Sequence, residues 1–232
     1  MTRLLTLLLS SALSLEFITA PVGACLSQEF TCSQGLCVPK DRECDFTDNC
    51  GDGSDEEDCS RYKRCDFEET GLCDLIQTSG WTRTTEVPGL KHDHTNSTSA
   101  HFLSLSPVRG NTATADLSSP VFLPSQTCQM SFYHYSGAKH GALQVLVQTL
   151  DESTEMWKHS TQPRMETWQQ TVIQFSSNHS FQVVIQGQLS ADSEASEVLA
   201  IDDLSFSPGC LTVPGTATIN NISLHRRDKF RP

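Results

Sequence analysis

The chain has 232 residues, ten cysteines and a formal net charge of −12. This acidic balance argues against nucleic acid as a partner, because binding to phosphate backbones needs a basic face that displaces counterions. The even number of cysteines is typical of an oxidising compartment, where thiols are joined in disulfides.

The first 24 residues have the pattern of a secretory signal peptide. Arg3 precedes the apolar run Leu4–Leu15, and small residues before Cys25 provide a cleavage point. A membrane anchor is the alternative, but the run is shorter than the roughly 20 residues that span a bilayer, and Glu16 interrupts it. Because no second long apolar run follows, we expect a secreted product and no transmembrane segment in this chain.

Residues 25–59 form a cysteine-rich segment that ends in the acidic run Asp52–Asp58. A segment this short has almost no apolar core, since chains below about 40 residues usually need disulfides or a metal to fold. A disulfide framework would force the carboxylates together, and a cation would relieve their repulsion. The six cysteines are Cys25, Cys32, Cys37, Cys44, Cys50 and Cys59.

The cysteine spacing and the motif Cys44-Asp45-Phe46-Thr47-Asp48-Asn49-Cys50-Gly51-Asp52-Gly53-Ser54-Asp55-Glu56 resemble an LDL-receptor class A repeat, a calcium-binding extracellular module. The resemblance implies the disulfides Cys25–Cys37, Cys32–Cys50 and Cys44–Cys59. It also implies a calcium site made by side-chain oxygens of Asp45, Asn49, Asp55 and Glu56 and by backbone carbonyls of Arg42 and Thr47. Asn49 stands where the family more often has aspartate, so we expect a weaker calcium affinity.

After an expected linker at Ser60–Arg64, residues 65–210 have the pattern of a β domain. Hydrophobic residues alternate with other side chains in Leu143–Val147 and Phe181–Ile185, which is the period of strands buried on one face. Turn-forming pairs such as Pro88-Gly89 separate the runs, and no long helical periodicity competes. The sequence therefore predicts an antiparallel β-sandwich.

Four stretches of this region resemble the landmarks of a MAM domain, a jelly-roll-like β-sandwich of extracellular adhesion and receptor proteins. They are residues 65–73, 81–83, 181–187 and 199–210. The resemblance implies the disulfides Cys65–Cys73 and Cys128–Cys210. It also implies a second cation near the first and last strands, with Asp66, Glu68 and Asp203 as candidate ligands. The alternative, in which these side chains accept hydrogen bonds from backbone donors, stays open.

Other chemistry finds less support in the sequence. His92 and His94 alternate along one segment and could ligate a metal, but no further ligand stands near them, so ordinary surface histidines are the preferred interpretation. The chain has no His-Glu-x-x-His motif, no Gly-x-Ser-x-Gly elbow and no phosphate loop. A catalytic triad that is assembled only in space stays open. We expect a protein that is not an enzyme.

The remaining features agree with an extracellular protein. Asn-x-Ser/Thr triplets predict glycosylation at Asn96, Asn178 and Asn221, and residues 211–232 match neither module, so we expect a flexible tail. The overall prediction is a mainly β, secreted, calcium-binding pair of modules that binds extracellular proteins, with homophilic contacts through the MAM domain. The alternative is a short form or fragment of a larger cell-surface receptor or extracellular protease ectodomain.

Overall fold

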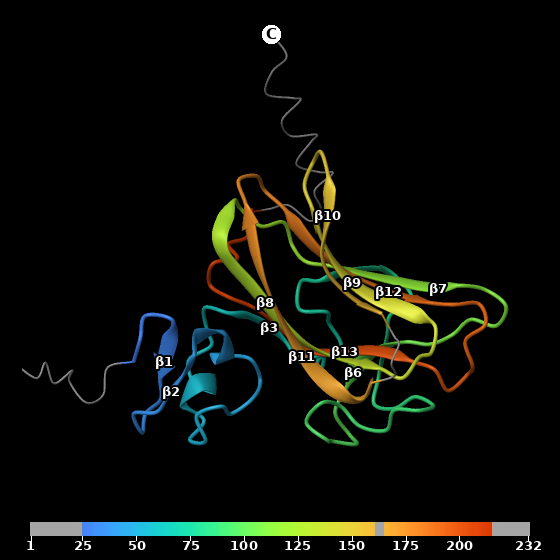
Figure 1. Ribbon diagram of the computed structural model, residues 1–232, viewed down its shortest axis with the longest axis horizontal. Helices are drawn as coiled ribbons and strands as arrows, with labels where there is room; N and C mark the ends of the chain where they lie inside the picture. The colour runs from blue at the N-terminus through green and yellow to red at the C-terminus, as the bar shows by residue number, and fades with distance from the viewer. Residues whose placement is uncertain (1–24, 161–164, 215–232) are drawn as a thin grey trace, which may run out of the picture.

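The computed structural model describes residues 25–160 and 165–214, which form a small module beside a β-sandwich (Figure 1). The expected signal peptide and the residues after 214, including Asn221, lie outside the described residues. Within the described ranges, no helix has both the length and the apolar character that crossing a bilayer would need.

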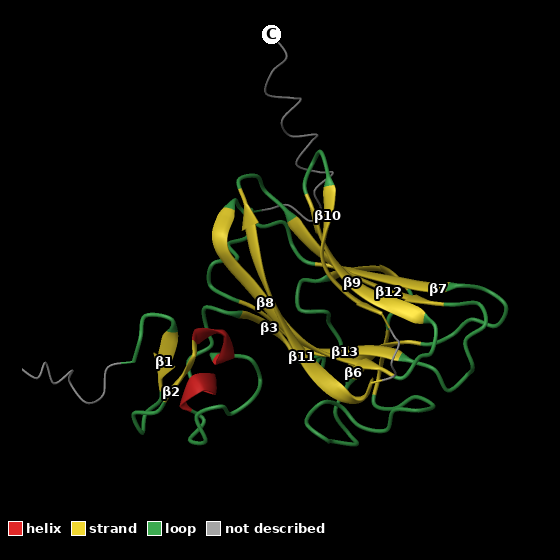
Figure 2. Ribbon diagram, viewed as in Figure 1, coloured by secondary structure: helices red, strands yellow, loops and turns green. Residues whose placement is uncertain are grey.

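The small module, residues 25–59, is called here the N-terminal module. Its regular structure is an antiparallel pair, β1 (Glu29–Thr31) and β2 (Cys37–Pro39), and two short 3-10 helices, η1 (Lys40–Arg42) and η2 (Ser54–Glu56), which are red in Figure 2. Its buried apolar cluster is small: Cys32, Val38 and Cys50, with Phe30 against them. Three disulfides join Cys25 to Cys37, Cys32 to Cys50 and Cys44 to Cys59, the pairs that the family resemblance implies.

The sandwich consists of two antiparallel sheets that face each other (Figures 1 and 2). One sheet has the order β10-β9-β12-β7-β4, and the other has the order β11-β8-β13-β6-β5, with β3 also paired to β13. The strands are β3 (Lys63–Cys65), β4 (Ile76–Ser79), β5 (Thr82–Thr84), β6 (Phe102–Leu105), β7 (Ala113–Ser118), β8 (Ser125–Ser136), β9 (Gly141–Gln148), β10 (Ser153–Ser160), β11 (Met165–Ser177), β12 (Gln182–Leu189) and β13 (Leu199–Phe206).

The core lies between the inner faces of the two sheets. The apolar residues that alternate in β9 and β12 are buried, as the period-two pattern predicts, and fully buried aromatic side chains such as Phe132 and Phe175 meet them from the other sheet. The core members from β9 and β12 are Leu143, Val145, Val147, Val183 and Ile185. The predicted antiparallel sandwich is confirmed.

Two segments that we expected to be irregular take part in the sandwich. Lys63 and Arg64, the last residues of the expected linker, lie in β3 and pair with β13. At the start of the expected tail, Leu211 accepts a backbone hydrogen bond from Leu123, and Val213 donates one to Val121. Lys63 and Arg64 run beside β13, and residues 211–213 run beside residues 121–123, and both pairings satisfy backbone groups that would otherwise lack partners.

Candidate functional site

The predicted calcium ligands lie in one loop of the N-terminal module, called here the acidic loop (residues 42–58). The Cys44–Cys59 disulfide closes most of this loop. The Asp55 carboxylate accepts the backbone N–H groups of Asn49, at 2.8 Å, and of Cys50, at 3.4 Å. Glu56 Oε1 accepts the N–H of Asp45 at 2.6 Å. These bonds cross the loop, so its carboxylates hold the backbone in place as well as carrying charge.

Two of the predicted oxygen ligands meet at the side-chain amide of Asn49, which is itself a predicted ligand. Asn49 Nδ2 donates to Asp45 Oδ1 at 3.0 Å and to the Thr47 carbonyl at 2.8 Å. The two oxygens therefore point at one positively polarised group, as they would point at a cation. Asn49 itself has an amide oxygen, and hard oxygen donors of these three kinds are those that calcium prefers. The donor set fits calcium.

The three carboxylates of the site are not gathered at one point. In the part of the chain that the structure describes, groups of three acidic, histidine or cysteine side chains within 4.8 Å occur at two other places. One of them, Cys25, Glu29 and Cys37, includes a disulfide and offers no thiolate. Asp45, Asp55 and Glu56 would thus have to move closer together to share an ion.

The acidic loop carries negative charge in partly buried surroundings. Burial raises the pKa of both Asp45 and Glu56, since a charged carboxylate is disfavoured away from water. Arg64 offsets part of this cost: its guanidinium lies 2.6 Å from Glu56 Oε2 and sits over the Phe46 ring at 3.8 Å. A divalent cation between the carboxylates would stabilise their charged forms further.

The acidic loop contacts the outer face of the sandwich, beside β8 and β11 (Figure 1). Gln170 of β11 donates through Nε2 to Asp45 Oδ2 at 2.8 Å, and its Oε1 accepts a hydrogen bond from Arg42. Thr47 Oγ1 forms a hydrogen bond with the Tyr133 hydroxyl of β8. Gln170 and Tyr133 are opposite each other in the β11–β8 pairing, so one spot on the sheet receives all these contacts.

A second acidic cluster includes two residues of β13, the strand next to β8 in the same sheet. Ligand atoms of His94, Asp202 and Asp203 all lie within 4.8 Å of one another, and both aspartates are buried. Asp203 has φ 46°, and the β13–β8 register shifts between Asp202 and Ser205. Burial, then the Asp203 charge, raises the pKa of Asp202 to about 9, and burial raises that of Asp203. A cation bound at this cluster would lower both pKa values.

The three residues that the sequence proposes for this second cation do not share one cluster. Asp66 Oδ1 accepts the backbone N–H of Glu68 at 3.1 Å, and the Glu68 carboxylate accepts the backbone N–H of His101 at 2.6 Å. The contacts of these two acids match the alternative in which they satisfy backbone donors. Asp203 instead meets His94, which was interpreted from the sequence as an ordinary surface histidine because no further ligand stands near it in the chain.

A pair of histidines lies between the sheets. His134 of β8 is 2% exposed, its ring centroid is 5.3 Å from that of His159 of β10, and its Nε2 is 3.0 Å from Thr171 Oγ1. In the described part of the chain, Nδ1 of His134 and Nε2 of His159 have no hydrogen-bond partner. Burial, and secondarily the neighbouring His159, lowers the pKa of His134 to about 4.

This pKa shift predicts a loss of stability in acid. The folded pKa of about 4 lies below the ordinary value of 6.5, so folding favours the neutral ring, and stability falls as the pH drops from 6.5 towards 4. Complete titration would cost about 3 kcal/mol of unfolding free energy. His134→Gln, which cannot titrate, should flatten the slope in chemical denaturation measured at several pH values. Asp202 has the opposite effect on stability, but it is present in both the natural chain and the His134→Gln variant, so it does not affect the comparison. Parallel curves of stability against pH for the two proteins would contradict the prediction.

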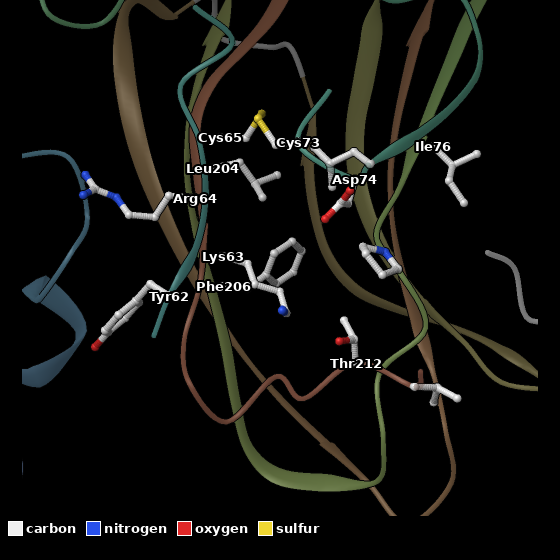
Figure 3. Close-up of a pocket in the computed structure, with 13 residues that line it drawn as sticks. Tyr62, Lys63, Arg64, Cys65, Cys73, Asp74, Ile76, Leu204, Phe206 and Thr212 are labelled. Atoms are coloured by element: carbon white, nitrogen blue, oxygen red, sulfur yellow. A yellow bond between two sulfur atoms is a disulfide. The ribbon is translucent and has the colours of Figure 1, made fainter. Parts of the chain in front are cut away.

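A cavity of about 610 Å³ opens between β3 and the segment that leads into β4 (Figure 3). Buried Leu204 and Phe206 line it, the Cys65–Cys73 disulfide lies at one end, and the Asp74 carboxylate is directed into it. Its size is within the range of about 300–1,000 Å³ that is usual for small-ligand pockets. None of its lining residues belongs to the acidic loop or to the aspartate cluster, although Arg64, which pairs with Glu56 of the acidic loop, lies in its wall.

Two predicted glycosylation acceptors have the exposure that a glycan requires. Asn96 and Asn178 are both exposed on loops of the sandwich, Asn96 with φ 66°. Asn178 Oδ1 accepts a hydrogen bond from Gln126 Nε2 at 3.1 Å. Occupancy of either site stays a prediction.

Comparisons with known proteins identify both parts of the chain. The family model described as MAM domain, meprin/A5/mu, matches residues 65–211, and the one described as low-density lipoprotein receptor domain class A matches residues 23–59. Both families are non-catalytic.

Individual relatives share shorter stretches. The human membrane frizzled-related protein is 40% identical over 60 residues, which are 25% of this chain and 10% of the relative. The human Kunitz-type protease inhibitor 1 is 48% identical over 68 residues, or 22% of this chain and 13% of the relative. This chain thus spans about a tenth of the length of these relatives. The K1 cleaved adhesin domain of Lys-gingipain from Porphyromonas gingivalis W83 superimposes with a TM-score of 0.46 at 11% identity, over 63% of this chain and 97% of that one.

Proposed function

Since the chain belongs to the MAM family and carries an LDL-receptor class A domain ahead of its MAM domain, we propose that it is a secreted, calcium-binding protein whose two domains bind other extracellular proteins as one unit. The domain families support an extracellular protein-interaction pair. The observation that carries the calcium proposal is the convergence of Asp45, Thr47 and Asn49 in the acidic loop. The proposed domains are residues 25–59 and 65–210.

Calcium would be held by the side chains of Asp45, Asn49, Asp55 and Glu56 and by the carbonyls of Arg42 and Thr47. When bound, the ion supplies positive charge to carboxylates that burial disfavours, and it joins parts of the acidic loop that are otherwise linked only by hydrogen bonds and one disulfide. We propose a second cation at Asp203, with Asp202 and His94 as its other ligands in place of Asp66 and Glu68.

The partners that this arrangement suits are extracellular proteins, including a second copy of the chain through the MAM domain. The sandwich offers the largely exposed strand β10 and two proposed glycan positions, Asn96 and Asn178, on its loops. A second candidate is that these domains form part of a larger cell-surface receptor or protease ectodomain, which the much greater length of the relatives favours.

Calcium titration of the secreted chain tests the proposal. We expect isothermal titration after chelation to show binding at the acidic loop, and Asn49→Asp to tighten it about tenfold, because one more ligand carries negative charge. Gln34→Glu, which adds the same charge outside the loop, is the matched control. Absence of calcium binding would count against the proposal, and so would an equal gain from Gln34→Glu.

Assembly and catalysis are tested with the same material. Sedimentation velocity with calcium and with chelator reports whether the MAM domain pairs with itself. Incubation with broad peptide and ester substrates should give no turnover. Turnover that a single side-chain change abolishes would overturn the binding-only function.

A further inference from the structure

The contact between the two domains involves the same residues as the proposed calcium site. We propose that the outer face of the sandwich at Gln170 and Tyr133 is a docking surface for the acidic loop of the same chain, and that docking and calcium binding strengthen each other. This inference rests on the proposed calcium site and adds an internal partner and a form of regulation to it.

Asp45 is shared between the two sites. Its Oδ1 faces the inside of the acidic loop, where it accepts hydrogen bonds from the Thr47 N–H at 3.1 Å and from Asn49 Nδ2 at 3.0 Å. Its Oδ2 faces outward and accepts the hydrogen bond from Gln170 Nε2 at 2.8 Å. The carboxylate is 1% exposed, and both of its oxygens accept hydrogen bonds from protein groups. Docking therefore sets the orientation of a proposed calcium ligand.

Gln170 is held on both sides of its amide. Its Nε2 donates to Asp45, and its Oε1 accepts from Arg42, which itself lies 3.6 Å from Asp45 Oδ2. An amide that engages a cation and an anion at once has one favourable orientation, because the reversed amide would face each charge with the wrong pole. The contact is thus specific for the Arg42 and Asp45 pair of the loop.

Thr47 provides the second point of attachment. Its carbonyl is a proposed calcium ligand, and its hydroxyl forms a hydrogen bond with Tyr133. Tyr133 is fixed from behind by stacking on His94, at a centroid distance of 3.7 Å and an interplanar angle of 19°. Arg42, Asp45 and Thr47, half of the proposed ligands, therefore touch two side chains that stand side by side on the sheet.

Calcium binding and docking are coupled because each of them restricts the same acidic loop. A loop already held by the sandwich loses less conformational freedom when calcium binds, and a loop held by calcium loses less when it docks. Linkage makes the effect reciprocal, and coupling between sites typically changes affinities about 5- to 150-fold.

The test uses the complete secreted chain with Gln170→Ala and Tyr133→Phe combined, because these changes leave every proposed calcium ligand in place. Isothermal titration should show calcium binding about fivefold weaker or more. Small-angle X-ray scattering should show a larger maximum dimension for this variant, and for the natural chain in chelator. Gln188→Ala, at an exposed position of β12 on the other sheet, is the matched control and should change neither quantity.

The two readouts separate the possible failures. A variant with natural scattering shows that the two side chains do not hold the domains together, and it overturns the docking surface. An expanded variant with natural calcium affinity overturns the coupling. If isothermal titration shows no calcium binding to the natural chain, the proposed function is overturned, and the coupling with it. The scattering comparison between the variant and the natural chain still tests the docking surface. Thermal melts that match the natural sandwich confirm that a scattering change reflects the contact and not unfolding.

Discussion

Alanine at both Cys128 and Cys210 is expected to lower the unfolding free energy of the sandwich by about 4 kcal/mol, more than alanine at Cys65 and Cys73, for which we expect about 2–3 kcal/mol. The first disulfide closes a loop with a sequence separation of 82 and the second one of 8, and the entropy that a crosslink removes from the unfolded chain grows with loop length. For a domain of this size, the larger loss corresponds to a fall in Tm of about 8–16 °C.

The structure adds a second reason for this order. Cys128 and Cys210 are 0% and 2% exposed, and they join β8 to the turn that follows β13, next to the segment that pairs Leu211 with Leu123. Cys73, in contrast, is exposed and lies in a turn. Thermal and denaturant melts of the two double variants, with the N-terminal module intact in both, provide the measurement. Equal losses would show that loop length does not decide the contribution.

Much of the architecture could be predicted because it depends on local patterns. The cysteine spacing of the N-terminal module is a property of one short segment, and the alternation in Leu143–Val147 directly reflects a strand with one buried face. The comparisons confirm the order of the two domain families. The pairing of Lys63 with β13 and of Leu211 with Leu123 could not be predicted, because contacts with distant parts of the chain leave no local signature.

The contacts that matter most for the proposed function could not be predicted in this way. Asp45 and Gln170 are 125 positions apart, and Thr47 and Tyr133 are 86 apart, so neither pair forms a motif. His94 meets Asp203 only because its loop folds back over β13, where a register shift allows Asp203 its positive φ. In the sequence, Gln170 and Tyr133 have the pattern of ordinary surface residues of strands. Only the pairing of β11 with β8 places them opposite each other.

The second large effect is expected at Asp55. Asp55→Ala removes a proposed charged calcium ligand and leaves the N–H groups of Asn49 and Cys50 without their acceptor, in a position that is 1% exposed. Removing the charged partner of buried donors costs about 3 kcal/mol or more. This is a large fraction of the stability of a module whose buried apolar cluster has three members. After reduction, we expect the Asp55→Ala variant to refold in calcium with scrambled disulfide pairs among the six cysteines of this module. Peptide mapping identifies the pairs.

Two comparisons locate the cause of the misfolding. Glu57→Ala removes the same charge from an exposed neighbour and should refold with natural pairs, while the natural chain refolded in chelator should scramble as Asp55→Ala does. The pairs Cys65–Cys73 and Cys128–Cys210 should form in every case, because the sandwich has an apolar core of its own. If Asp55→Ala regains natural pairing in chelator, the acidic loop does not need the ion to fold. The disulfides would then be sufficient to order the loop, and calcium would act only on a module that is already folded.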